Sequence, residues 1–162
     1  MKTRTLLAAG ALAGVATIAS VAAATPAGAA RFRPVIEMGS TTAGFAVVDG
    51  AAIVTGEMDG RPYRGTYTAT LTADDGSLPA PGDCEPATAV FHLDARVGRY
   101  LDVTATGDVC GEFVQLPYIT THAFVGRYDV TGSTKQNVLG TDGWFEIRLG
   151  DDGSASTFLV DT

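Results

Sequence analysis

"TTHAFVGRYDVTG" spans residues 120 to 132 and alternates apolar with polar side chains. On an extended strand, residues two apart point to the same face. Phe124, Gly126 and Tyr128 therefore share one face, and Arg127 lies on the other. A core-facing glycine weakens a strand unless the backbone bends sharply or a neighbouring strand passes close by. The pattern therefore predicts a strand whose apolar face lines the core of a curled sheet.

"PYRGTYTAT" (62–70) repeats this arrangement with Tyr63, Gly65 and Tyr67. Two ring-flanked glycines predict two corner strands in equivalent positions of a closed or nearly closed β structure. A second echo, "ADDGSL" and "GDDGSA", is compatible with weak internal repetition, and equally with a chance match between short strings.

The rest of the chain after the N-terminal segment shows the same period of two, and no window has the three-and-four spacing of an amphipathic helix. Gly, Asp, Pro and Thr interrupt the alternation at short intervals, which is typical of all-β domains. We expect one antiparallel β-barrel or sandwich of about 8 to 10 strands. Hairpin turns are expected at Asp49-Gly50, Asp59-Gly60, Asp142-Gly143 and Asp152-Gly153. The expected strands are 44–49, 52–58, 62–72, 87–96, 99–106, 111–117, 122–131, 135–140, 143–149 and 154–161.

Residues 1–29 have the features of a secretory signal peptide. Lys2 and Arg4 precede an uncharged run rich in Ala, Leu and Val, and a small-residue cleavage site follows at Ala29. A retained membrane anchor is the alternative, but the run is mostly alanine and glycine, whereas a span needs about 20 strongly apolar residues. Cleavage would leave residues 30–42 as a tail or an edge strand and 43–162 as one all-β domain, which predicts a secreted protein, extracellular or associated with the cell envelope.

The composition is acidic, with 11 Lys and Arg against 18 Asp and Glu. Removal of the signal peptide takes away Lys2 and Arg4 and makes the chain more acidic still. Nucleic acids and anionic membranes bind clusters of basic residues. We therefore expect no nucleic-acid partner and no membrane insertion after cleavage.

The chain has two cysteines, Cys84 and Cys110, both in the part expected to be exported. In an oxidising compartment such a pair predicts one disulfide. Cys84 belongs to the proline-rich and glycine-rich stretch 73–87, which we expect to be an irregular loop that the disulfide holds against the segment around Cys110. Such a loop either carries function or covers one end of the fold.

No catalytic or cofactor-binding motif is present: the sequence has no nucleophile elbow, zinc-protease motif, phosphate loop or dinucleotide fingerprint. We therefore predict no cofactor and lean toward a protein that is not an enzyme. The Asp-Gly turns offer oxygen ligands for calcium, but they match no EF-hand loop and are what hairpins require, so no metal site is predicted. His92 is expected on a solvated face, too far along the strand from Asp94 for direct pairing.

The candidate ligand-binding residues are the inward rings and one exposed ring: Tyr63, Tyr67, His122, Phe124, Tyr128 and Trp144. His122 shares the register of Phe124, so at a barrel mouth it is a candidate general base. The alternative is a strand-end histidine whose ring nitrogen meets a backbone carbonyl. Trp144 alternates with the apolar face of 143–149 and should point outward, as a binding anchor or as a cover for the open end.

Three functions follow from these features. The first is a secreted, non-catalytic binding domain that holds a small ligand or an extracellular protein through the barrel mouth or the Cys84 loop. The second is a small-barrel isomerase or hydrolase that uses His122 as base with Tyr63, Tyr67 or Tyr128 as hydrogen-bond donors. The third is a structural component of the cell envelope.

Overall fold

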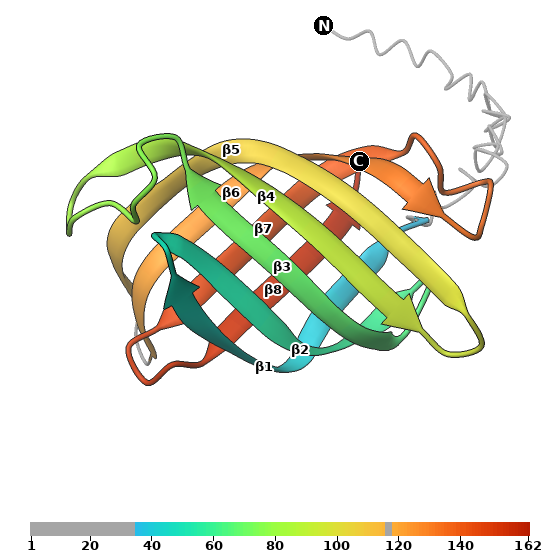
Figure 1. Cartoon of the computed structure of the whole chain (residues 1–162). Helices are drawn as coiled ribbons and strands as arrows, with labels where there is room; N and C mark the ends of the chain where they lie inside the picture. Colours follow the sequence, from blue (N-terminus) through green and yellow to red (C-terminus); the bar gives the residue numbers. More distant parts are fainter. Residues whose placement is uncertain (1–34, 116–117) are drawn as a thin grey trace, which may run out of the picture. The chain divides into compact units, whose positions relative to one another are not determined.

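The computed structural model describes residues 35–115 and 118–162, with side chains for 35–111 and 120–162. In these residues the chain forms a closed antiparallel barrel of eight strands, each paired with the next in sequence and the last with the first (Figure 1). The strands are β1 (Glu37–Val48), β2 (Ala51–Arg61), β3 (Gly65–Ala73), β4 (Cys84–Ala95), β5 (Arg99–Gln115), β6 (Tyr118–Ser133), β7 (Asp142–Gly150) and β8 (Ala155–Asp161). The all-β prediction is confirmed, and the sheet is a barrel rather than a sandwich.

The described residues include only part of the N-terminal segment. The predicted signal peptide lies outside the described residues, and of the segment 30–42 the stretch 37–42 belongs to β1, where it pairs with β2. The part of the chain that the structure describes contains no helix long and apolar enough to cross a membrane.

Two of the expected strand boundaries are wrong. The stretches 99–106 and 111–117 were expected as separate strands, but β5 runs through both as far as Gln115. Gly107 resembles a break in the sequence, yet it lies in register with Gly126 of β6, where two glycines allow the backbones to approach. Residues 135–140 are not a strand but turns within the β6–β7 connection, closed by a 2.9 Å hydrogen bond from Val130 N to Thr141 O.

Two of the four expected hairpin turns form. Asp49-Gly50 is the two-residue turn between β1 and β2, with φ angles of 50° and 83°, and Asp152-Gly153 lies in the β7–β8 turn. The prediction is wrong for Asp59-Gly60, which lies within β2, and for Asp142-Gly143, which opens β7. β2 continues past Asp59 because that stretch pairs with β1, so the chain reverses at 62–64 instead. Tertiary pairing outweighs local turn preference at these two sites.

Gly65 and Gly126 occupy places where a neighbouring strand passes very close. A Cβ atom on Gly65 would lie 1.9 Å from the carbonyl oxygen of Asp94, and one on Gly126 would lie 2.4 Å from that of Thr106. Real Cβ atoms cannot approach a backbone oxygen so closely, so only glycine fits. The expected close approach is confirmed at both glycines, but their positions are not equivalent: Gly65 begins β3, whereas Gly126 lies in the middle of β6.

Apolar side chains fill the barrel interior. Phe91 of β4 is fully buried, with its ring centroid 5.3 Å from that of Tyr67 and 5.9 Å from that of Phe145. Phe124 packs edge-on against Phe145 at 6.0 Å. Offset and edge-to-face contacts at these distances are favourable beyond the area that they bury. Rings from β3, β4, β6 and β7 therefore meet one another across the barrel.

Cys84 and Cys110 form the predicted disulfide, with a Cα–Cα distance of 4.1 Å. The loop is shorter than expected, since Cys84 is the first residue of β4 and lies directly opposite Cys110 of β5. The bond therefore joins two strands that already pair, beside the base of the loop 74–83. A formed disulfide is typical of an oxidising compartment.

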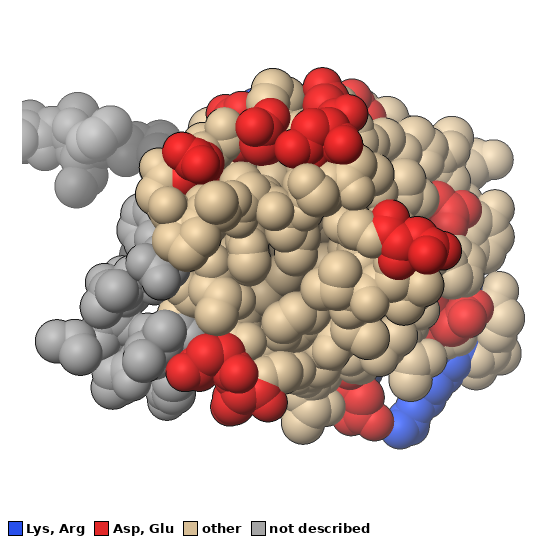
Figure 2. Space-filling model, turned by 60° about the vertical axis from the view of Figure 1, so that its left-hand side comes forward, with Lys and Arg blue, Asp and Glu red and all other residues tan. Residues whose placement is uncertain are grey.

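The two ends of the barrel differ in charge. The turns 49–50, 74–83 and 151–154 lie at one end, and the residues described there include no Lys or Arg (Figure 1). Their acidic residues are Asp49, Asp74, Asp75, Asp83, Asp151 and Asp152. Figure 2 brings this side toward the viewer and shows carboxylates scattered over it, with very little basic surface. Most arginines lie at or near the opposite end, so the charge of the molecule is polarised along the barrel.

Candidate functional site

Four of the predicted ligand-binding residues belong to the core. Tyr63, Tyr67, Phe124 and Tyr128 are at most 4% exposed and pack in the barrel interior. The inward direction that the sequence predicts for them is confirmed. A role in ligand binding does not follow from it, because these side chains fill the interior and contact one another or other parts of the barrel.

The tyrosine hydroxyls differ in their partners. Tyr67 Oη donates to Thr157 Oγ1 at 2.9 Å, and Tyr63 Oη lies 2.7 Å from Thr134 Oγ1 in the β6–β7 connection. Tyr128 Oη is buried without a hydrogen-bond partner among the described residues, and burial raises its pKa, with a further increase from the nearby Asp161 carboxylate. All three hydroxyls are therefore fixed within the fold or enclosed by it.

His122 lies at the acidic end and contacts the loop that covers it. Its Nε2 lies 3.1 Å from the carbonyl oxygen of Pro79, and its Nδ1 lies 3.3 Å from Thr121 Oγ1. Pro79 is buried and Leu78 packs against the core, so the loop 74–83 lies over this barrel end. Tyr63 contacts the connection at the other end. Tyr128 is six residues along β6 from His122, about 20 Å on an extended strand. The structure does not bring His122 and these tyrosines together.

Trp144 points outward, as the alternation predicts, and is 47% exposed. The guanidinium of Arg127 lies 5.1 Å from its ring centroid and also bonds the Asp142 carboxylate at 2.6 Å. The ring lies on the outer wall near the start of β7, toward the barrel end opposite His122. Trp144 is therefore exposed on the wall and does not cover the open end.

His92 lies on the outer wall between the carboxylates of Asp94 and Asp102. Its Nδ1 lies 2.5 Å from Asp102 Oδ1 on β5, and its Nε2 lies 3.3 Å from Asp94 Oδ1 on its own strand. The expectation that Asp94 lies out of reach is wrong, because the imidazole ring extends along the strand and spans the gap. The hydrogen bond to Asp102 raises the pKa of His92, and Asp94 adds to the effect. The ring also stacks on Tyr100, with centroids 6.5 Å apart.

Four hollows lie on the outer wall between β8 and β4, with volumes of about 280, 320, 530 and 410 Å³. The third and fourth both lie over β1 to β4, one beyond the other along the strands. Neighbouring hollows share lining residues: Phe158 lines the first and second, Asp59 the second and third, and Glu57 and Asp94 the third and fourth. The four hollows therefore adjoin one another on the wall, and we call the set the outer track. Its lining is drawn from five strands that are neighbours in the barrel, β8, β1, β2, β3 and β4, with a contribution from β7 at one end.

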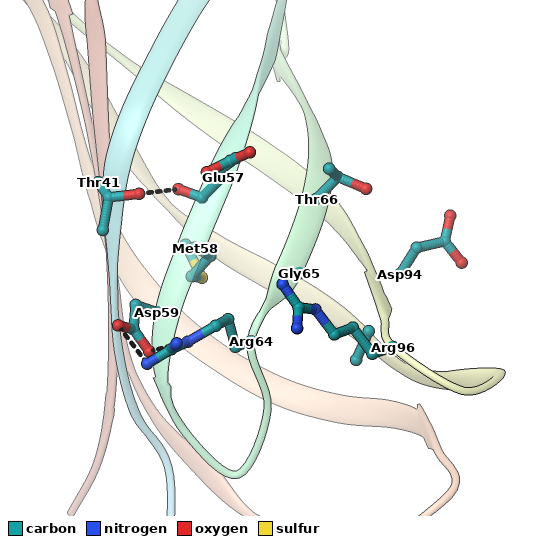
Figure 3. Close-up of a pocket in the computed structure, with 10 residues that line it drawn as sticks. Thr41, Glu57, Met58, Asp59, Arg64, Gly65, Thr66, Asp94 and Arg96 are labelled. Carbon is teal, nitrogen blue, oxygen red and sulfur yellow. Dashed lines mark hydrogen bonds and ion pairs between the residues drawn. The ribbon is translucent and has the colours of Figure 1, made fainter.

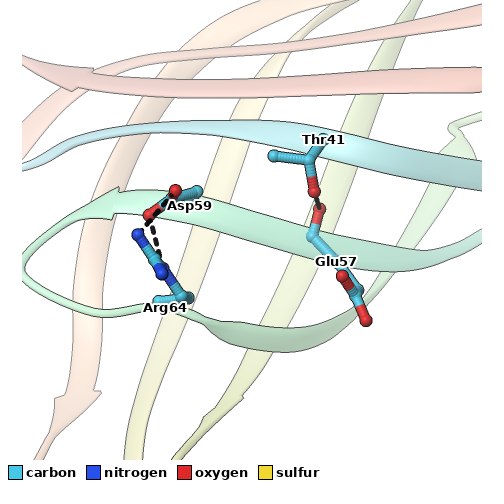
Figure 4. A network of polar contacts seen from close by, with 4 residues as sticks. All are labelled: Thr41, Glu57, Asp59 and Arg64. Carbon is cyan, nitrogen blue, oxygen red and sulfur yellow. Dashed lines mark hydrogen bonds and ion pairs between the residues drawn. The ribbon is translucent and has the colours of Figure 1, made fainter.

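The largest hollow lies at the centre of the track, over β2 and β3 (Figure 3). Arg64 forms two 2.8 Å hydrogen bonds with the Asp59 carboxylate (Figure 4). These bonds lower the pKa of Asp59. Glu57 differs from Asp59 in its contacts. Its backbone carbonyl accepts a weak 3.4 Å hydrogen bond from Thr41 Oγ1, whereas its carboxylate points outward (Figure 4).

Arg96 extends from the β4–β5 turn toward the same hollow, and its guanidinium reaches back over β3 near Gly65 in Figure 3. No ion-pair partner is seen for Arg96 or for Glu57 among the described residues. The centre of the track therefore offers one carboxylate and one guanidinium that are available to a ligand, beside the hydroxyl of Thr66. Such groups can bind a polar molecule by charge-assisted hydrogen bonds.

Metal binding finds no support in the described part of the barrel. No group of three or more His, Cys, Asp or Glu side chains there is arranged to hold an ion. The Asp-Gly turns that raised the calcium question use their carboxylates internally, since Asp75 and Asp152 each accept a 2.9 Å hydrogen bond from the backbone N–H two residues on.

The fold and the track together define an eight-stranded, disulfide-linked, up-and-down β-barrel with a filled interior and a polar depression on its outer wall. Comparison with known proteins adds no family to this description: the chain matches no protein-family model, no curated protein and no solved structure.

Sequence reasoning missed the residues of the track. Glu57, Asp59, Arg64 and Arg96 attract no attention in the sequence because each is a single charged residue at an outward position. The alternation of apolar and polar residues could have identified one of them, because it places the Glu57 side chain on the outer face of β2. Which outward residues become neighbours depends on strand register, and the misplaced turn at Asp59-Gly60 obscured that register.

Proposed function

We propose that the chain is an exported, non-catalytic binding protein whose ligand lies in the outer track. The observation that carries this proposal is the contrast between an interior occupied by apolar side chains and the adjoining polar hollows of the track. A site at the barrel mouth has less support, because the loop 74–83 packs over one end and His122 contacts that loop.

Export is supported by two features. The N-terminal 29 residues have the sequence of a cleavable signal peptide, and Cys84 and Cys110 form a disulfide. Expression of the full chain should therefore give secreted protein whose first residue is Ala30. N-terminal sequencing of the protein in the medium tests this, and an uncleaved chain that stays in the membrane fraction would refute it.

The enzymatic alternative receives no support from the geometry. General acid–base catalysis requires the base and the donor groups to reach the same substrate atoms. His122 and Tyr63 lie at opposite barrel ends, and the Tyr67 hydroxyl is already bonded to Thr157. No specific observation favours a structural role in the cell envelope.

The binding site is tested by mapping amide chemical shifts of the purified protein against three pools of compounds: neutral oligosaccharides, basic peptides and acidic peptides. At least one pool should shift amides of the track, such as those of Glu57, Thr66 and Asp94, and leave those of Leu78 and His122 unchanged. Shifts confined to the loop 74–83 would place the site at the mouth and reject the track. No shift with any pool would reject the binding function.

A further inference from the structure

We infer that the ligand of the outer track is a neutral carbohydrate chain. This inference rests on the proposed function, because it names the chemical class of ligand for the same site. Four properties of the track support it: its balance of charge, its hydrogen-bonding groups, an exposed aromatic ring and its length across the barrel.

The track is charge-balanced in an otherwise acidic protein. Its lining includes five carboxylates, four guanidinium groups and His92, whereas the whole chain carries a net charge of −7. The carboxylates belong to Glu37, Glu57, Asp59, Asp94 and Glu146, and the guanidinium groups to Arg61, Arg64, Arg96 and Arg148. A ligand of strong charge gains little here, since attraction to one sign is offset by repulsion from the other. The track therefore favours a ligand without net charge.

The polar groups of the track match hydroxyl-rich ligands. A sugar hydroxyl both donates and accepts hydrogen bonds, and so do the exposed hydroxyl groups that line three of the hollows. They belong to Thr41, Thr42, Thr55, Thr66, Thr68 and Ser156. The Glu57 carboxylate can accept from a ligand hydroxyl, and the Arg96 guanidinium can donate to ring and hydroxyl oxygens. Bonds to charged groups are the stronger ones, so these two residues should determine affinity.

Phe158 provides an apolar surface in the middle of this polar lining. The ring is 43% exposed, lies 3.5 Å from the position of a Cβ on Gly39, and borders two adjacent hollows. Because Gly39 has no side chain, one side of the ring rests close to the backbone of β1. An exposed ring among hydroxyls and charged groups suits a ligand with an apolar face and polar edges, which a pyranose ring has.

The shape of the track favours a chain over a single sugar. The hollows lie over five neighbouring strands of the closed barrel, so at about 4.8 Å per strand the track measures about 20 Å round the curved wall. A small ligand is usually enclosed over most of its surface in a pocket. The track is instead shallow and open along the wall, so that several sugar units can contact it in succession while the rest of the polymer continues beyond.

Isothermal titration calorimetry with neutral hexasaccharides tests the inference, with cellohexaose, xylohexaose, maltohexaose and N-acetyl-chitohexaose as probes and with hexalysine and hexagalacturonate as charged counterparts. At least one neutral hexasaccharide should bind. Its Kd should change by less than about twofold between about 0.05 M and 0.5 M NaCl, because a neutral ligand gains little from screened charges.

Matched variants place that binding on the track. E57Q and R96Q should each weaken it by about tenfold through loss of a charge-assisted hydrogen bond. R99Q, which changes another arginine at the same turn but outside the hollows, should leave it unchanged. F158L should weaken binding while keeping an apolar side chain in place, and W144A should not; unfolding temperatures confirm that each variant is folded.

The outcomes separate this inference from the proposed function. If the neutral hexasaccharides fail to bind and hexalysine or hexagalacturonate binds and shifts track amides, the carbohydrate inference is wrong and the track remains the site. If a neutral hexasaccharide binds but W144A abolishes binding and E57Q, R96Q and F158L do not, the track assignment is wrong. If none of the probes binds, the carbohydrate inference is rejected, and the amide mapping decides separately whether the track binds anything.

Discussion

At the scale of single residues, glycines allow neighbouring strands to approach closely, and His92 carries an imidazole whose pKa is shifted by its neighbours. Glycine is required where a neighbouring backbone leaves no room for Cβ, as at Gly65 within the sheet, where a Cβ would lie 1.9 Å from a carbonyl oxygen. His92 is held by carboxylates on both ring nitrogens, an arrangement that both N–H donors satisfy only when the ring is protonated.

Replacement of Gly65 by alanine should destabilise the barrel by about 3 kcal/mol, because β3 and β4 must separate to admit the methyl group. Chemical denaturation followed by tryptophan fluorescence measures the change. G44A is the matched control, since its Cβ would lie 3.4 Å from the nearest atom and its backbone conformation is ordinary. Equal stability of the two variants would show that the strands separate at little cost.

His92 should make the stability of the protein depend on pH. Its folded pKa lies above the ordinary value of 6.5, mainly because of the hydrogen bond to Asp102, so the unfolded state binds fewer protons near that pH. The stabilisation is full below pH 6.5 and is lost as pH rises through the folded pKa. Because the pair is exposed, D102N should cost about 0.5 kcal/mol at acidic pH and less at alkaline pH.

Thermal unfolding of wild type and D102N at about pH 5.5 and pH 8.5, either side of the histidine pKa, measures this difference. D129N, which removes an exposed carboxylate of β6 with no ion pair of its own among the described residues, should show no such dependence. A D102N deficit that is the same at both pH values would contradict the assignment.

At the level of elements, β3 and β7 correspond more closely than the two ring-flanked glycines do. Each has a glycine within its first two residues whose Cβ would meet a carbonyl oxygen of the next strand, Asp94 at 1.9 Å for Gly65 and Val160 at 2.1 Å for Gly143. Each then places a ring against Phe91 and ends in a DDGS turn. Gly143, rather than Gly126, therefore has the environment that Gly65 has, and both strands lead into the repeated DDGS string.

The disulfide is the element whose contribution is easiest to isolate. It closes a segment of 26 residues between β4 and β5, which corresponds to roughly 3.5 kcal/mol in the chain-entropy treatment. The C84S/C110S double variant should lose about that much stability in denaturant unfolding and keep the barrel's far-ultraviolet circular dichroism spectrum. Wild-type protein should show the same loss after reduction, while the double variant should not respond to reductant. A loss in the variant alone would point to local packing instead.

The choice of strands by sequence succeeded where alternation was uninterrupted, as in β3, β6, β7 and β8, because burial on one face imposes a period of two. It failed at "KQNVLG" (135–140), where only two apolar residues fall within six and the chain folds into turns. It also failed at Asp59-Gly60, a sequence that suits a turn but lies in β2 because its neighbours pair with β1. At Asp59-Gly60, long-range pairing therefore outweighed local turn preference.

On the scale of the whole molecule, charge is distributed unevenly. One barrel end carries six aspartates in its turns with no Lys or Arg among the residues described there, while the track on the wall is charge-balanced. Like charges brought together in the folded state oppose folding unless salt screens them. The acidic end should therefore limit stability at low ionic strength.

Raising NaCl from about 0.02 M to about 0.5 M should increase the unfolding temperature by about 3 °C, because the Debye length falls below the spacing of the turns. D74N/D151N should raise the unfolding temperature at low salt and reduce the salt effect, since neither side chain has a hydrogen bond or an ion pair in the described structure. Calorimetry at the two salt concentrations measures both. An unchanged salt response in the double variant would show that the repulsion arises elsewhere.

The sequence by itself determined the strand-rich fold, the inward direction of the tyrosine and phenylalanine rings and the pairing of Cys84 with Cys110. These properties depend on local alternation, or on there being a single possible pair. Only the tertiary structure decided that the sheet closes, that the rings fill the interior, and that outward residues of five strands form one track. Closure brings β8 beside β1, and register decides which outward side chains are neighbours; both depend on pairing between residues far apart in the chain, which no local pattern records.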